Sequence, residues 1–281
     1  MSDTNNDPPA AKRRGRPRQD MGSAALNDDR PFVTSLARGL SILRAFRAED
    51  MVLGTQAIAE RTGLHKTTVS RLLGTLTKLG YLRYMPEYGK YAVSNQVLTL
   101  GFAAIGRFGF SEVVRGHLEE MAAGGDCVVA LSVRDGIDMM FVELIRKPTA
   151  VALNLNVGSR IPLALSAPGR AYLAATDAAE RDELFTRLAK LYGKDWPARK
   201  AALETALARV PVQGYSDSFG EWNPHHNAIG VAVRDPLTGD LYTLSLGGNA
   251  ARLPREVLID THLPRLLKAA QAITALSTGP R

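Results

Sequence analysis

The chain of 281 residues contains a single cysteine, Cys127, so no disulfide can form within it. It also lacks any apolar run near the roughly 20 residues that a helix needs to span a bilayer. The first residues carry no apolar core of a secretion signal, and we therefore expect a cytoplasmic location. The sequence contains no Walker-type loop and no dinucleotide fingerprint. It also contains no nucleophile elbow, since Ser166 lacks the flanking glycines of that motif. These absences predict a protein that is not an enzyme and holds no cofactor.

The sequence offers few candidate residues for metal binding or redox chemistry. His225 and His226 are adjacent, so their side chains point apart, and no Cys, Asp or Glu cluster with ligand spacing surrounds them. We interpret the segment 222–226 as a loop, with metal binding as the lesser alternative. Cys127 is predicted to be a buried strand residue rather than a redox centre.

Charge is distributed unevenly along the chain. Residues 1–100 hold 15 Lys and Arg against 9 Asp and Glu, a net charge of +6, whereas residues 101–281 hold 20 against 19, a net charge of +1. A basic excess confined to one part of a chain is typical of a nucleic-acid-binding segment.

The first 30 residues are rich in Asp, Asn, Pro, Gly and charge and poor in large apolar side chains, which predicts disorder. Within them the run KRRGRPR, residues 12–18, resembles an AT-hook, whose Gly-Arg-Pro core lies in a narrow minor groove. In that interpretation Arg14 and Arg16 contact DNA. A plain basic tail that raises affinity for any polyanion is the alternative.

Residues 55–81 have the spacing of a helix-turn-helix. Thr55 is placed to cap the first helix, and Gly63 to end it and open the turn. In the second helix the apolar side chains fall on one side, namely Val69, Leu72, Leu73, Leu76 and Leu79. The opposite side offers hydroxyls and cations that suit a major groove: Lys66, Thr67, Thr68, Ser70, Arg71, Thr75 and Lys78. An ordinary amphipathic helix pair with a solvated polar face is the alternative.

The flanking segments complete a winged helix. Two short β-prone runs, 82–84 and 91–93, are joined by a turn-rich segment that places Gly89 and Lys90 near a hairpin tip, so Lys90 joins the predicted DNA contacts. Before the pair, Leu36, Leu40, Leu43 and Phe46 recur on one stripe of a first helix. Residues 94–107 follow as an apolar linker helix, which either pairs with the same helix of a second subunit or is buried in its own chain.

From residue 113 onward, helical and strand-like patterns alternate. We expect strands at 127–133, 139–145, 150–157, 228–234 and 241–246, and helices at 117–123, 167–174, 178–191, 199–210 and 254–277. A mixed sheet with helices on its faces is the economical packing. The fold class is therefore α+β.

Taken together, FVTSLARGLSILRAF, the helix-turn-helix, GSRIPLALSAPGRAYLA and GYSDSFGEWNPHHNAIGVAVRD resemble the IclR family of bacterial transcription regulators over residues 32–278. The opening and closing segments look most like the branch that controls aromatic-acid catabolism. The resemblance implies a basic tail (1–30), a winged helix-turn-helix domain (32–93), a linker and dimerisation helix (94–111) and a GAF-like effector-binding domain (112–278).

The resemblance also implies an effector pocket. Its positions fall on Ser166, Ala167, Pro168, Ser218, Ala228, Ser245 and Gly247, with Arg170 where a Lys is usual and Ala228 where a Cys is common. Hydroxyls and free backbone amides would hold a carboxylate there, and Leu163, Ile229 and Leu246 would cover its apolar body.

We therefore expect a dimeric or tetrameric regulator that binds a double-stranded DNA operator and responds to a small carboxylate effector, possibly aromatic. One alternative is a constitutive DNA-binding architectural protein whose C-terminal domain only oligomerises.

Overall fold

The computed structural model describes residues 32–47, 49–105, 111–147, 155–235 and 238–275. The predicted disordered tail, with Arg14 and Arg16, lies outside these residues. So do the end of the predicted linker helix and most of the strand predicted at 150–157.

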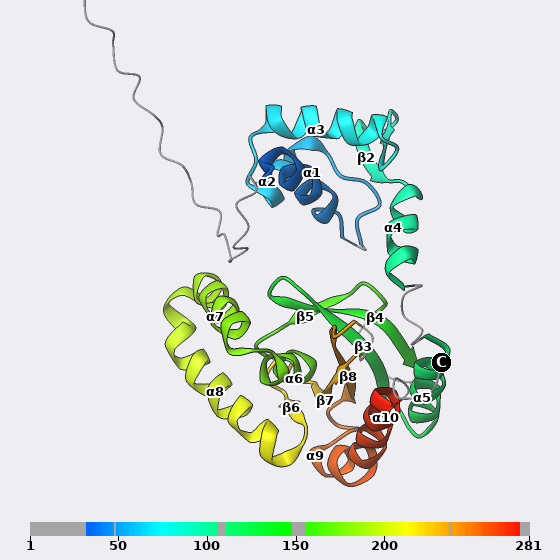
Figure 1. Cartoon of the computed structure of the whole chain (residues 1–281), viewed down its shortest axis with the longest axis vertical. Helices are drawn as coiled ribbons and strands as arrows, with labels where there is room; N and C mark the ends of the chain where they lie inside the picture. Colours follow the sequence, from blue (N-terminus) through cyan, green and yellow to red (C-terminus); the bar gives the residue numbers. More distant parts are fainter. Residues whose placement is uncertain (1–31, 48, 106–110, 148–154, 236–237, 276–281) are drawn as a thin grey trace, which may run out of the picture. The chain divides into compact units, whose positions relative to one another are not determined.

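The N-terminal part is a winged helix (Figure 1). Three helices precede a two-stranded antiparallel hairpin in which Leu82 pairs with Val93 and Met85 with Lys90. A further helix then leads away from the hairpin. The elements are α1 (Thr34–Arg44), α2 (Thr55–Thr62), α3 (Lys66–Lys78), β1 (Leu82–Met85), β2 (Lys90–Val93) and α4 (Gln96–Ile105).

The small core of this domain forms where the three helices meet the hairpin. Its fully buried side chains include Ile42 of α1, Ile58 of α2, and Val69 and Leu73 of α3. The apolar stripe predicted for α3 is thus largely confirmed, since Leu76 is also buried. Leu79 is the exception: it lies just beyond the end of α3 and is 58% exposed.

Two further details of the prediction were wrong. Thr55 is the first residue of α2 rather than its cap; the capping position falls on Gly54, and no side chain caps this helix. In α1 the stripe predicted to face inward includes Leu36 and Leu40, but these are 62% and 52% exposed, and Ile42 takes the core position instead.

The C-terminal part is built on one six-stranded sheet with the order β5-β4-β3-β8-β7-β6. Every pairing among the described strands is antiparallel, so the expectation of a mixed sheet was wrong. The strands are β3 (Val128–Asp135), β4 (Asp138–Arg146), β5 (Arg160–Pro162), β6 (Ser216–Phe219), β7 (His226–Arg234) and β8 (Leu241–Asn249).

Helices cover both faces of this sheet (Figure 1). One face packs against α5 (Ser111–Ala123) and the C-terminal helices, and the other against α6 (Ala167–Ala175), α7 (Ala178–Tyr192) and α8 (Trp196–Gln213). Successive strand residues therefore serve different cores: Val129 faces α5, and Ala130 faces the α6 side.

Two segments differ from the sequence prediction. Strand β6, with the polar sequence SDSF, was missed because it lacks apolar alternation. The single helix expected at 254–277 is interrupted: α9 (Arg255–Val257) continues into a π-helical turn at 258–262 before α10 (Leu263–Ala275). Of the strand predicted at 150–157, only residues 155–157 are described; they form no strand, and β5 begins at Arg160.

Helix α6 lies unusually close to neighbouring backbone. Seven of its residues, Ala167 to Leu173, are buried. A Cβ atom built on Gly169 would lie 2.0 Å from the carbonyl oxygen of Leu163, and one built on Gly230 of β7 would lie 3.1 Å from the carbonyl carbon of Ala167. Only glycine permits this approach at position 169.

We therefore expect Gly169→Ala to lower the free energy of unfolding by about 1–3 kcal/mol, because backbone atoms cannot yield to the new methyl group. Gly116→Ala in α5 is the matched control: nothing lies within 4 Å of its Cβ position, and alanine is the better helix former. Urea denaturation of both variants checks this. A Gly169→Ala variant as stable as the Gly116→Ala variant would contradict the close packing.

Candidate functional site

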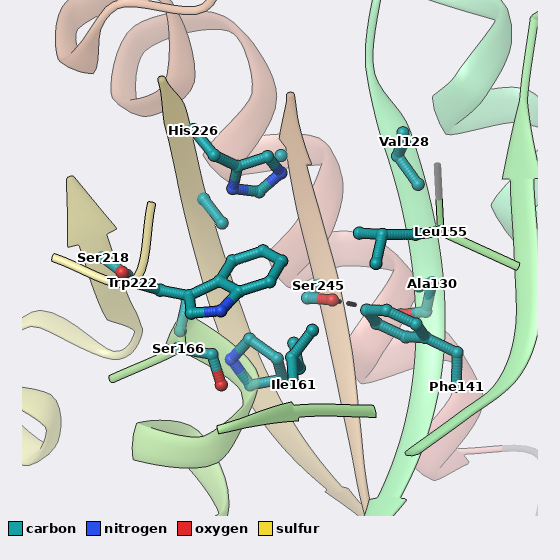
Figure 2. Close-up of a pocket in the computed structure, with 14 residues that line it drawn as sticks. Val128, Ala130, Phe141, Leu155, Ile161, Ser166, Ser218, Trp222, His226 and Ser245 are labelled. Carbon is teal, nitrogen blue, oxygen red and sulfur yellow. Dashed lines mark hydrogen bonds between the residues drawn. The ribbon is translucent and has the colours of Figure 1, made fainter. Parts of the chain in front are cut away.

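A pocket opens on the α6 side of the sheet, where the N-terminus of α6 meets the central strands. Its cavity volume is about 30 Å³, within about 400 Å³ of empty space that includes open solvent. Figure 2 shows the labelled side chains directed around a common space. The lining residues are Val128, Ala130, Phe141, Leu155, Ile161, Ser166, Ala167, Pro168, Ser218, Trp222, His226, Ala228, Ser245 and Gly247.

The structure brings together all seven residues carried over as an effector pocket, although they come from four separate elements. Ser166 caps α6, and Ala167 and Pro168 form its first turn. Ser218 lies on β6, Ala228 on β7, and Ser245 and Gly247 on β8. The pairing of Ser218 with Ala228, and of Ala228 with Gly247, sets these residues side by side across three strands.

The serine hydroxyls already have hydrogen-bond acceptors. Ser166 Oγ donates to the carbonyl of Pro162 at 2.7 Å, and Ser218 Oγ donates to that of Leu165 at 2.7 Å. Ser245 Oγ lies at the longer distance of 3.5 Å from the carbonyl oxygen of Ala130. Each hydroxyl has one proton to donate, so a carboxylate would have to displace these bonds. The expectation that the hydroxyls are available to a ligand is therefore wrong for Ser166 and Ser218 in this conformation, whereas Ser245 makes only the long contact.

The N-terminus of α6 offers a different donor. Gly169 N–H donates to Ser166 Oγ, Pro168 has no N–H, and the amide of Ala167 has no hydrogen bond among the described residues. The first turn of a helix also carries a partial positive charge. No Lys or Arg is among the described residues that line the pocket, so this helix end is its main attraction for an anion.

The apolar walls differ from the prediction. Leu163, Ile229 and Leu246 do not line the pocket: Leu163 belongs to the core under α6, and the other two face α5 and α10. Strand alternation explains this. Ile229 follows the pocket residue Ala228, and Leu246 lies between Ser245 and Gly247, so both side chains point to the opposite face of the sheet. Phe141, Leu155, Ile161 and Trp222 form the walls instead. Phe141 could have been found from alternation along its predicted strand, whereas Ile161 lies on the three-residue β5, which was not predicted, and Leu155 and Trp222 belong to loops.

The two ends of the segment 222–226 lie at the pocket. Trp222 and His226 both line it, with their rings edge to face at 5.4 Å, while His225 is exposed. Burial lowers the pKa of His226 to about 4, so its imidazole is neutral near pH 7. The two histidines thus face different surroundings, and no group of three or more potential ligands occurs in the described ranges.

The predicted DNA-binding side chains lie on α3 and on the wing. Lys66, Thr67, Ser70, Arg71, Thr75 and Lys78 are exposed, and Thr68 is half-buried. None of the cations among them forms an ion pair with a described residue, so their charge is available to phosphate. Lys90 is also exposed, at the start of β2.

Cys127 is fully buried beside β3, and its burial raises the thiol pKa to about 11. A thiol of this kind is not a nucleophile at neutral pH, which agrees with the prediction of a structural cysteine.

The chain thus has a winged helix whose α3 carries cations without ion-pair partners among the described residues, followed by a domain that contains a pocket. This combination defines the class of DNA-binding transcriptional regulators. Matches to models of known protein families identify which family of regulators it is. The IclR helix-turn-helix domain matches residues 35–86, and the bacterial transcriptional regulator IclR C-terminal domain matches residues 102–275. The chain belongs to the IclR family of transcriptional regulators, which are not enzymes.

Individual relatives are similar to this chain over most of its length. The HTH-type transcriptional regulator TsaQ1/TsaQ2 of Comamonas testosteroni is 31% identical over 246 residues, which cover 87% of this chain and 88% of that protein. An IclR-family regulator from Brucella abortus has a solved structure with 34% identity, a TM-score of 0.80, and coverage of 90% of this chain and 96% of that one.

A third relative shares the fold at lower identity. The IclR homologue of Microbacterium hydrocarbonoxydans, solved in complex with 4-hydroxybenzoate, has a TM-score of 0.67 and 21% identity, and it covers 87% of this chain and 99% of that one. These comparisons confirm the predicted family and fold class. Among the described helices, none combines the length and the apolar character needed to cross a bilayer.

The depressed pKa of His226 predicts how stability depends on pH. Between pH 6.5 and about 4 the unfolded chain binds a proton at this residue and the folded chain does not, so its contribution to stability is present above pH 6.5 and is lost as the pH falls. Lowering the pH from 7 to 5 should cost about 1–2 kcal/mol through this group. Thermal unfolding of the wild type and His226→Gln at both pH values measures it. An equal pH dependence in the two proteins would contradict a buried neutral imidazole.

Proposed function

We propose that this regulator responds to a small organic acid bound in the pocket at the N-terminus of α6. The observation that carries the proposal is the convergence of all seven expected residues on one pocket, with the Ala167 amide unpaired among the described residues. A carboxylate accepting from that amide also gains from the partial positive charge of the helix end.

The walls favour an acid with a ring. Phe141, Trp222 and His226 present aromatic faces and edges, and Leu155 and Ile161 add apolar surface. Such walls stabilise a flat apolar body, with the few polar groups fixing its orientation. The structural relative from Microbacterium hydrocarbonoxydans was solved with 4-hydroxybenzoate, an acid of this kind.

On the DNA side, we propose that α3 lies in the major groove with Lys66, Arg71 and Lys78 toward the duplex, and that Lys90 of the wing contacts phosphate. The hydroxyls of Thr67, Thr68, Ser70 and Thr75 would supply the remaining contacts. Unpaired cations beside short hydroxyl side chains on one helix face support this arrangement.

We also propose that the regulator acts as a homodimer or a homotetramer. Phe32, Leu36 and Leu40 at α1, and Leu98 and Leu100 on α4, are each more than half exposed in the single chain. Apolar surface of this extent around a DNA-binding domain supports a second copy as partner.

Replacing Arg71 by alanine should weaken operator binding by about 1–3 kcal/mol if the guanidinium meets a base, and flatten the salt dependence if it meets phosphate. The fold should be unchanged, because Arg71 is exposed. Gel-shift titration at two salt concentrations separates the two cases. Lys194→Ala, which removes an exposed charge from the C-terminal domain, is the control, and equal affinity of both variants would remove Arg71 from the interface.

Ligand that binds only the folded protein must raise its melting temperature, with about 2.7 kcal/mol of stabilisation at a concentration 100 times Kd. A thermal-shift screen of aromatic and dicarboxylic acids should therefore identify stabilising compounds. Ala228→Phe places a ring in the pocket and should abolish the shift while leaving effector-free DNA binding intact. If no acid stabilises the wild type, or if Ala228→Phe leaves a shift unchanged, the effector proposal fails and a constitutive architectural protein becomes the better description.

A further inference from the structure

The loop between β6 and β7, residues 220–225, carries one wall of the pocket. Its ends are held by backbone hydrogen bonds, from Gly220 N–H to the carbonyl of His226 at 3.1 Å and from His226 N–H to that of Asn223 at 2.9 Å. Between these bonds lies Trp222, whose indole lines the pocket. Figure 2 shows the indole and the Phe141 ring on opposite sides of Ser245.

A neighbouring side chain ties this loop to α6. Glu221 Oε1 accepts a hydrogen bond from Arg170 at 2.9 Å, and its other oxygen accepts from the backbone N–H of Phe219. Among the described residues, this ion pair is the one side-chain hydrogen bond between the loop and a helix. The adjacent residue, Trp222, is therefore linked to α6 through Glu221.

Arg170 is suited to anchor the pair. Its side chain is 5% exposed, and it also donates to the carbonyls of Asp217 at 2.8 Å and Ala164 at 3.4 Å. A planar guanidinium held by two carbonyls cannot turn away to water, so its remaining charge is directed at Glu221. Because α6 also forms the pocket floor, the pair locks one wall of the pocket to the floor.

We propose that Glu221 is a positioning residue that, through Arg170, holds Trp222 as an aromatic wall, and that this wall makes the site selective for flat rings over saturated ones. The second half rests on the proposed function, since it assumes that the pocket takes an acid. The first half concerns the chain alone and is tested without any effector.

The chain has two tryptophans, Trp196 and Trp222, so Trp196→Phe leaves Trp222 as the sole indole emitter. Trp196 packs against Phe185 and Tyr192 on the far helices and does not line the pocket, and a phenyl ring preserves those contacts. In this background, acrylamide quenching and emission wavelength report how far water reaches the Trp222 ring.

Glu221→Ala should raise the quenching constant about twofold and shift the emission to the red, because the freed loop exposes the ring. Glu221→Gln, which keeps the shape and one acceptor, should give a smaller effect and guards against misfolding of the alanine variant. Glu204→Ala on α8, which breaks an exposed pair with Lys200, is the charge-matched control and should change neither signal. Unchanged quenching in Glu221→Ala would overturn the positioning role.

Benzoate and cyclohexanecarboxylate test the ring preference, since they share a carboxylate and similar size but only one is flat. In the otherwise wild-type chain, benzoate should give the larger thermal shift, and Trp222→Leu should remove the difference. A preference that survives in Trp222→Leu, or a wild type that responds to neither acid, overturns the selectivity. Failure of every acid in the wider screen refutes the effector site itself, and the quenching result then still decides the role of Glu221.

Discussion

The C-terminal domain depends on the contact between the N-terminus of α6 and the strands β6 and β7. Ser216 Oγ lies within hydrogen-bond distance of the carbonyls of Ala167 and Gly230, at 2.7 and 3.0 Å, and Ser218 Oγ donates to Leu165. These bonds satisfy polar backbone that the close packing removes from water. They also hold the start of α6 in place, and hence the position of the pocket.

The same contact limits the chemistry of the pocket. The hydroxyls that hold α6 in place are the ones that a ligand would otherwise use, so Ser166 and Ser218 serve the architecture first. What is left for an anion is a helix end with one unpaired amide among the described residues. If a serine hydroxyl gives up its bond to a backbone carbonyl in order to bind a carboxylate, the net gain in free energy is small, because one hydrogen bond is exchanged for another. Affinity must then come largely from the apolar walls.

Much of the DNA-binding domain follows from periodicity, because α3 is amphipathic and most of its polar face is exposed in the described part of the chain. Leu36 and Leu40 show where periodicity fails: an apolar stripe does not say whether its partner is the same chain or another surface. In the C-terminal domain, periodicity found the long strands but not β6, whose four residues are mostly polar. The pocket positions came from the family resemblance, since no spacing rule joins residues 166, 218, 228 and 245.

The details that sequence could not supply are those that depend on three-dimensional partners. Leu163, Ile229 and Leu246 were assigned to the pocket for their apolarity, but strand alternation and the fold of the α6 turn place them in the two cores. Arg170 and Glu221 are 51 positions apart, so their pairing follows from topology alone. An exposed acid that neutralises a buried guanidinium has a different consequence from a surface ion pair, because its removal leaves a charge that water cannot reach. The loop that carries Trp222 is thereby coupled to α6, in which the residues from Ala167 to Leu173 are all buried.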